Sequence, residues 1–273
     1  MATQSTQYNS QQGPYDELRK TTIAIVERVN IRSIVLPFLK DANVLDLACG
    51  SGFYTHAFLK WGAKKVIGVD ISSAMLEEAR LIGRNDGTSD NLDFIEADCS
   101  KAEVYPGGPF DIVFGAWLLN YASTGKELVE FWRNIYINLK PGGHFVGVTP
   151  PPTNDPAGVI ETEQKLRPLP TASGGLYTTI NREIEEGVEM HLHKDTPVGP
   201  LDFDTYHLRN DIWIDAARAA GFTSEIEWTV TEIPSEFMTD PGKYGEDSDG
   251  GAGADELETY SKHPHYGLIL VTK

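Results

Sequence analysis

The sequence has few cysteines, no long apolar run and few basic residues, and each shortage excludes a class of protein. Its 2 cysteines, Cys49 and Cys99, have neither a C-x-x-C spacing nor a histidine partner at the spacing of a zinc site. We therefore expect neither a disulfide framework nor a metal centre. No apolar run approaches the length of a membrane span, and residues 1–12 lack the apolar segment of a secretory signal. We expect a cytoplasmic protein without a membrane segment.

Positive charge is scarce along the whole chain. Lysine and arginine total 23 against 40 aspartates and glutamates, which gives a formal net charge of -17 at pH 7. This charge repels the phosphate backbone of nucleic acids at long range, so we do not expect nucleic acid as a partner. With 273 residues and 40% apolar content, the chain can form one large domain or a domain with a cap. We expect a monomer or a homodimer.

The most informative stretch, residues 44–55, has the pattern of a buried strand, a glycine turn and the start of a helix. The strand is apolar except for Asp46, and a buried carboxylate is costly unless it is paired or meets a ligand. Gly50 and Gly52 let a ligand approach the main chain closely. The helix that follows would aim its first N–H groups at a carboxylate or a phosphate. A small charged ligand is therefore expected on this turn.

Two cofactor classes use such a turn, and the third position of the motif separates them. A dinucleotide fingerprint reads G-x-G-x-x-G, with the third glycine allowing close helix packing. Here Thr55 stands at that position, and the motif is Asp46-x-x-x-Gly50-x-Gly52. This favours a cofactor other than a dinucleotide, while an NAD-dependent oxidoreductase remains the alternative at this point.

Further signals follow in order along the chain. A second strand, Lys65–Asp70, ends in an acid that can accept hydrogen bonds from both hydroxyls of a ribose. A third strand over residues 92–97 is followed directly by Asp98, and a fourth strand covers residues 110–115. The segment Leu139–Gly143 stops a helix and turns on two glycines into a fifth strand.

This ordered set of motifs resembles the signature of the class I S-adenosylmethionine-dependent methyltransferases, over about residues 42–149. The resemblance implies an α/β fold with a Rossmann-like, doubly wound, seven-stranded sheet, mostly parallel with the last strand antiparallel. It also implies S-adenosylmethionine as cofactor, S-adenosylhomocysteine as product, and methyl transfer to an O, N or C atom of a small-molecule acceptor. It is nearest to small-molecule enzymes of microbial secondary metabolism, and the Asn-Pro-Pro-Tyr motif of amino-methylating nucleic-acid enzymes is absent.

The resemblance also implies a set of cofactor-binding residues. Asp46 is expected at the amino-acid part of the cofactor, Asp70 at the ribose, and Asp98 with the backbone N–H of Cys99 at the adenine. Core packing of Met75 and a helix-capping role for Asp98 are the alternatives. The complete expected set is Tyr15, Asp46, Ala48, Gly50, Gly52, Asp70, Ile71, Met75, Asp98, Cys99 and Ala116.

Residues 1–40 are predicted to form an N-terminal mobile segment and a helical lid. Pro14 is expected to open a helix over residues 15–30, and a second short helix is expected over residues 31–39. Tyr15 in this lid is expected to close over the cofactor, as N-terminal tyrosines often do in the family. The alternative is that Tyr15 only packs the helix onto the core.

The rest of the chain divides into a cofactor-binding core, an insert and a return to the core. The core is expected at residues 41–150, its C-terminal part at 210–273, and the insert at 151–209. The insert has the pattern of a helix and an antiparallel β roof over the acceptor site. Its strands are expected at Leu176–Ile184, Val188–His193 and Leu201–Leu208. Residues 240–256, rich in glycine and acid, are predicted to be a mobile surface loop.

Acceptor contacts are expected after the fourth strand, because ligands of open α/β sheets bind beyond the carboxyl ends of the strands. The expected acceptor-binding residues are Trp117, Asn120 and Tyr121. Neutral imidazole can take a proton from an acceptor, and the alternative is a polar face that is only solvated. The catalytic candidates are His191, His193, His207 and Tyr121. A non-catalytic protein that only binds the cofactor remains possible, because cofactor binding and chemistry are separable.

Overall fold

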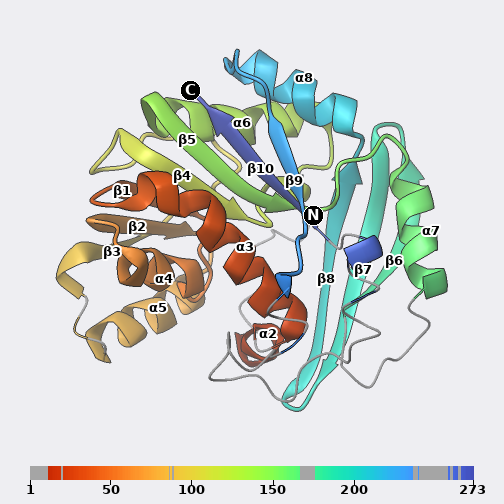
Figure 1. Ribbon diagram of the computed structural model, residues 1–273, viewed down its shortest axis with the longest axis horizontal. Coiled ribbons are helices and arrows are strands. Elements are labelled where there is room, and N and C mark those ends of the chain that lie inside the picture. The colour runs from red at the N-terminus through yellow and green to blue at the C-terminus, as the bar shows by residue number, and fades with distance from the viewer. Residues whose placement is uncertain are drawn as a thin grey trace.

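The computed structural model describes residues 12–19, 21–85, 87, 89–166, 176–235, 239, 258, 261–263 and 266–273. Within these ranges a seven-stranded sheet lies beside a smaller three-stranded sheet (Figure 1). The loop predicted at 240–256 falls outside the described residues. Among the helices of the described ranges, none is both long enough and apolar enough to cross a membrane.

The large sheet has the strand order β3-β2-β1-β4-β5-β10-β9. Strands β1 to β5 are parallel to their neighbours, whereas β10 is antiparallel to both β5 and β9. This confirms the predicted doubly wound sheet with an antiparallel last strand. The strands are β1 Asn43–Leu47, β2 Lys65–Asp70, β3 Leu92–Glu96, β4 Phe110–Ala116, β5 Leu139–Thr149, β9 Glu227–Val230 and β10 Gly267–Thr272.

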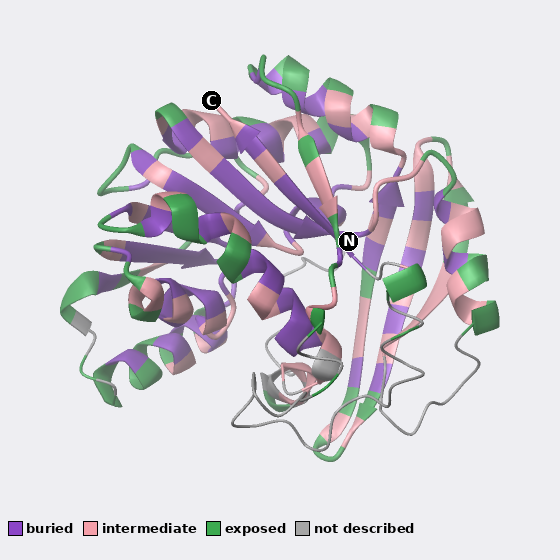
Figure 2. Ribbon diagram, viewed as in Figure 1, coloured by how far each residue is buried: buried purple, intermediate pink, exposed green. Residues whose placement is uncertain are grey.

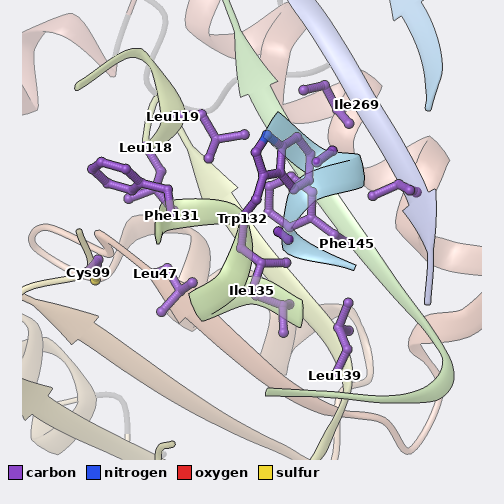
Figure 3. Close-up of a cluster of buried hydrophobic side chains, with 14 of the residues drawn as sticks. Leu47, Cys99, Leu118, Leu119, Phe131, Trp132, Ile135, Leu139, Phe145 and Ile269 are labelled. Carbon is purple, nitrogen blue, oxygen red and sulfur yellow. The ribbon is translucent and has the colours of Figure 1, made fainter. Parts of the chain in front are cut away.

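Helices cover both faces of this sheet, which is why its central strands are apolar runs rather than alternating patterns. On one face α6 and α8 bury Trp132 and Trp213 in a cluster with Phe145 of β5. Figure 3 shows Trp132 beside Phe145 in this cluster. On the other face α3 and α4 bury Val35 and Phe58 against the same strands. Figure 2 shows these strands buried along most of their length. The helices are α3 Thr22–Leu39, α4 Phe53–Trp61, α5 Ser73–Asn85, α6 Gly125–Asn138 and α8 Asn210–Ala220.

The N-terminal helices break at a different place from the one predicted. The structure has α2 over Gln12–Leu18 and α3 over Thr22–Leu39, so the first helix begins before Pro14. The break falls here because Thr21 caps α3 through its side chain. The helix does not break between residues 30 and 31, where the sequence predicts it. The side-chain amide of Asn30 donates to the carbonyl oxygens of Val26 and Glu232, which holds this residue within α3.

The insert forms the predicted antiparallel roof, with β7 between β6 and β8. Helix α7 packs on one face of it, where Ile160 contacts Val188, Met190 and Leu192. These three β7 residues alternate with polar neighbours, as their spacing in the sequence predicts. The elements are α7 Pro156–Leu166, β6 Tyr177–Ile184, β7 Gly187–Thr196 and β8 Gly199–Leu208.

Candidate functional site

The turn after β1 has an unusual backbone. Ala48, Gly50 and Gly52 all have positive φ angles, of 57°, 56° and 82°. At Gly52 an added Cβ would lie 3.0 Å from the Cβ of Ala79 and 3.1 Å from the ring of His56. Position 52 therefore needs glycine, both for its positive φ angle and because there is no room for a Cβ. Ala48 has a positive φ angle although it carries a side chain, and such backbone conformations concentrate at functional turns.

Asp70 connects the end of β2 to this turn. One carboxylate oxygen accepts a hydrogen bond from the N–H of Gly50 at 2.8 Å, and the other accepts one from the N–H of Ser72 at 2.8 Å. Burial raises the pKa of the Asp70 carboxyl, although the main-chain N–H groups oppose this effect. A carboxylate has about four lone-pair sites. Asp70 therefore keeps acceptor capacity for hydroxyl groups while its orientation is fixed by the main chain.

A cleft with about 740 Å³ of empty space opens at the carboxyl ends of β1, β2 and β4. The cleft brings together most of the predicted cofactor and acceptor residues. Those that line it are Tyr15, Ala48, Gly50, Asp70, Ile71, Met75, Asp98, Cys99, Ala116, Trp117 and Tyr121.

Three residues that line the cleft were missed from the sequence. Leu118 and Phe131 are apolar residues whose pattern cannot be told from that of the core. Ser100 could have been found from its place after Asp98, since its hydroxyl donates to that carboxylate at 2.6 Å. Burial alone would raise the pKa of Asp98, but hydrogen bonds from Ser100 and Lys101 outweigh burial and lower it. Asp98 is thus held in its ionised form beside the cleft.

Asp46 does not line the cleft. It is only 2% exposed, and it accepts a hydrogen bond from the hydroxyl of Thr55 at 2.6 Å. Burial raises the pKa of Asp46 to about 7, against the opposing effects of Thr55 and of the Arg19 charge. The threonine that replaces the third glycine of a dinucleotide motif therefore serves as the partner of this buried acid.

The comparisons with known proteins address the same part of the chain. Residues 44–143 match the family model described as a methyltransferase domain. This match identifies a methyltransferase domain within the chain, and the sheet order agrees with it. Residues 44–143 form a class I S-adenosylmethionine-dependent methyltransferase domain. The predicted family, fold and cofactor are confirmed, and the NAD-dependent alternative is set aside.

Two curated relatives show how far the similarity of the methyltransferase domain extends. The mRNA cap guanine-N(7) methyltransferase of Caenorhabditis elegans is 31% identical over 137 residues, which cover 45% of this chain and 34% of that protein. The C-methyltransferase UbiE of Pectobacterium atrosepticum is 28% identical over 180 residues, covering 63% of this chain and 70% of that protein. The chain spans only 34% to 52% of the length of the first four curated relatives it matches.

A solved structure shows the same fold over nearly the whole chain. This is the 1,6-didemethyltoxoflavin-N1-methyltransferase of Burkholderia thailandensis, with bound 1,6-didemethyltoxoflavin and S-adenosylhomocysteine. The TM-score is 0.58 at 16% identity, and the match covers 98% of this chain and 86% of that chain. The likeness includes the region of the roof as well as the methyltransferase domain.

The chemical groups on the cleft wall fit S-adenosylmethionine. Asp70 has acceptor capacity for ribose hydroxyls, and Asp98 with Cys99 lies on the wall after the neighbouring strand β3. Tyr15 and Trp117 supply aromatic rings, which attract cations such as a sulfonium. Among the described residues, no group of three or more His, Cys, Asp or Glu side chains could hold a metal ion. The methyltransferase domain can therefore hold its cofactor with side chains already placed around one cleft.

The segment after β4 forms part of the cleft wall, where acceptor contacts are predicted. Trp117 has a positive φ of 58°, and its indole Nε1 donates to a carboxylate oxygen of Glu27 at 2.9 Å. Tyr121 closes the short 3₁₀ helix Leu119–Tyr121, and burial raises the pKa of its phenol well above the usual range. Asn120 is buried and does not line the cleft. Of the predicted acceptor residues, Trp117 and Tyr121 therefore lie where an acceptor can reach them.

His191 and His193 lie on the roof face opposite α7, paired with aspartates of β8. The Nδ1 atom of His191 is 2.8 Å from Asp204, and that of His193 is 2.7 Å from Asp202. The hydrogen bond to Asp202 raises the pKa of His193. Neither histidine lines the cleft, and the bonded aspartates give both of them a structural partner. Their role as proton acceptors stays a prediction.

His207 is buried in the roof strand β8. It is 3% exposed, and its Nε2 donates to the carbonyl oxygen of Pro151 at 2.9 Å. Burial lowers the pKa of His207 to about 4, so the ring is neutral at pH 7. It does not line the cleft. Among the catalytic candidates, the structure brings only Tyr121 to the cleft wall.

Proposed function

We propose that this protein transfers the methyl group of S-adenosylmethionine to an O, N or C atom of a small-molecule acceptor. The observation that carries the proposal is that one cleft combines carboxylates that can bind a nucleoside with aromatic side chains. The carboxylates are those of Asp70 and Asp98, and the aromatic residues Tyr15, Trp117 and Tyr121 belong to the lid and the segment after β4. The sulfonium of the cofactor already activates the methyl group, so this chain has to orient the reactants and exclude water.

In this proposal each wall residue has a defined task. Asp70 binds the ribose hydroxyls and Asp98 binds the adenine amino group. Asp46 is buried behind the wall and attracts the ammonium of the amino-acid part through its charge. Trp117 packs against the acceptor. Tyr121 stays protonated because its pKa is raised by burial, so its hydroxyl can donate a hydrogen bond to the acceptor. Of the described residues that line the cleft, none is a histidine, and the proposal therefore needs no roof histidine as base.

A small-molecule acceptor is favoured by charge. The formal net charge of -17 opposes the approach of a nucleic acid, although one relative of the domain is an mRNA cap enzyme. Residues 151–209 are proposed to cover the acceptor, and residues 41–150 with 210–273 to form the core. The free cysteines Cys49 and Cys99 support a cytoplasmic location as part of this proposal.

The proposal is tested by following the methyl group. The protein is incubated with S-adenosylmethionine labelled in its methyl group, together with a metabolite extract or with capped RNA. Label that enters the metabolite fraction supports the proposal, and an enzyme-free sample gives the background. Label that enters capped RNA instead would contradict the small-molecule acceptor. S-adenosylhomocysteine binding without any transfer, across both fractions, would favour the non-catalytic cofactor-binding protein.

A further inference from the structure

A buried carboxylate outside the cleft wall joins three segments of the chain. Glu27 of α3 is 5% exposed, and a buried charge is costly unless it is fully hydrogen-bonded. Its Oε1 accepts from the hydroxyl of Tyr54 at 2.5 Å and from the guanidinium of Arg19 at 3.3 Å. Its Oε2 accepts from the indole of Trp117 at 2.9 Å. The donors belong to α4, to the turn between α2 and α3, and to the end of β4.

On the acceptor side, Glu27 fixes the orientation of a ring that lines the cleft. The indole of Trp117 has a single N–H donor, and that donor points at Glu27. The ring of Tyr266 packs edge-on against the indole with centroids 6.4 Å apart. A donor fixed at one point and an edge contact at another leave the indole little freedom to rotate. The carboxylate of Glu27 thereby sets the shape of the cleft at Trp117.

On the lid side, Glu27 holds Arg19, and Arg19 holds Tyr15. The side chain of Arg19 is 15% exposed, and its guanidinium carbon lies 5.1 Å from the ring centre of Tyr15. It also lies 5.0 Å from the ring of Phe53 and 5.2 Å from that of Tyr54. A cation enclosed by rings in this way needs a counter-charge, and Glu27 supplies it. Tyr15 lines the cleft, so the charge of Glu27 reaches the cleft through Arg19 as well.

We propose that Glu27 is a positioning residue of the methyltransferase site. It holds the Trp117 indole in place and, through Arg19, keeps Tyr15 of the lid docked on the same cleft. One carboxylate therefore sets the lid and the segment after β4 relative to each other. The inference rests on the proposed function, because it takes this cleft as the place of methyl transfer.

The test replaces the carboxylate by an amide of the same shape. Glu27→Gln keeps one oxygen acceptor, but its amide nitrogen cannot accept from Trp117 or Arg19. We expect S-adenosylhomocysteine, titrated by calorimetry, to bind about tenfold more weakly or worse, since hydrogen bonds to charged groups are lost. In a ¹⁵N–¹H spectrum of the indole groups, we expect the Trp117 signal to move. That signal is assigned by its disappearance in Trp117→Phe.

A matched control and a double variant separate positioning from general damage. Glu130→Gln removes the charge of an exposed glutamate that pairs with Arg133, and it should leave binding within about twofold of wild type. In the double variant Glu27→Gln with Trp117→Phe, we expect a loss smaller than the product of the single losses, because the two residues share one contact. Wild-type affinity in Glu27→Gln with an unmoved Trp117 signal would overturn the proposal.

Failure of the variant to fold and failure of the wild type to bind have different consequences. Should Glu27→Gln fail to fold, Trp117→Phe and Arg19→Met each break one of its contacts, and wild-type affinity in both folded variants would overturn the proposal. Should the wild type itself not bind S-adenosylhomocysteine, the proposed function fails. The Trp117 signal of the cofactor-free protein still tests the contact with Glu27 in that case, so the two failures are distinguishable.

Discussion

The buried position of Asp46 makes its ionisation unfavourable in the folded protein. Burial raises its pKa from 3.8 to about 7. At 1.36 kcal/mol per unit, charging this group in the folded state costs about 4 kcal/mol. The pKa of Asp46 is higher in the folded state than in the unfolded state. The protein therefore has its full folding stability below pH 3.8, and this contribution is lost as the pH rises through 7. Above that pH the fold contains an unfavourable carboxylate.

Asp46→Asn should therefore stabilise the ligand-free protein at high pH. The amide keeps an oxygen that can accept from the Thr55 hydroxyl, while the charge is gone. We expect the free energy of unfolding in urea to rise by up to about 4 kcal/mol at pH 8. At pH 5 the gain should shrink to about 1.5 kcal/mol, from the same 1.36 kcal/mol per unit. S-adenosylhomocysteine should nevertheless bind the variant more weakly, because its ammonium loses the charge of Asp46.

The control for this prediction is a carboxylate on the neighbouring strand with the opposite shift. Burial alone would raise the pKa of Asp111, but hydrogen bonds from Lys140 and from the N–H of Asn43 outweigh burial and lower it. Asp111→Asn should therefore cost a little stability at pH 8 instead of adding any. The reasoning is refuted if Asp46→Asn is less stable than the wild type at pH 8.

Two further predictions concern the turn and the roof. Gly52→Ala should lower the thermal stability by more than Gly142→Ala, because both glycines have positive φ but only Gly52 lacks room for a Cβ. Left-handed backbone alone costs about 1–2 kcal/mol, so equal losses at the two sites would show that the contacts with Ala79 and His56 do not matter. Folding lowers the pKa of His207 to about 4. Between pH 7 and 4 the unfolded state therefore binds more protons than the folded state, and the free energy of unfolding of the wild type falls by up to about 3 kcal/mol. Urea unfolding of His207→Asn should lack this share of the acid destabilisation, and an unchanged pH dependence would contradict it.

Much of the site could be predicted because its parts are local in sequence. Apolar runs that end in an acid predict Asp70 and Asp98 at the ends of neighbouring strands, and the strand order then brings them to one edge. The ends of α4 and α8 are local in the same way, because a glycine follows each helix directly and stops it in the left-handed conformation. Local signals such as these need no knowledge of distant contacts.

The remainder depends on contacts that a sequence pattern does not reveal. The apolar stripe of the N-terminal region continues without a visible break, so the sequence does not show that the first helix ends at Leu18. The alternation of β7 shows that His191 and His193 share a face, but not that neither side chain lines the cleft. Glu27 has the same pattern as any polar residue on a helix, and only the packed structure shows its three donors.

The most direct test of the account is a calorimetric titration of S-adenosylhomocysteine into the wild type and into Asp70→Ala. We expect roughly micromolar binding by the wild type and at least about a 100-fold loss in the variant, since two charge-assisted hydrogen bonds to the ribose are removed. Asp93→Ala, which removes an exposed partner of Lys65 on the adjacent strand, should bind like the wild type. Absence of binding by the wild type, or equal binding by Asp70→Ala, would contradict the assignment of this cleft as the cofactor site.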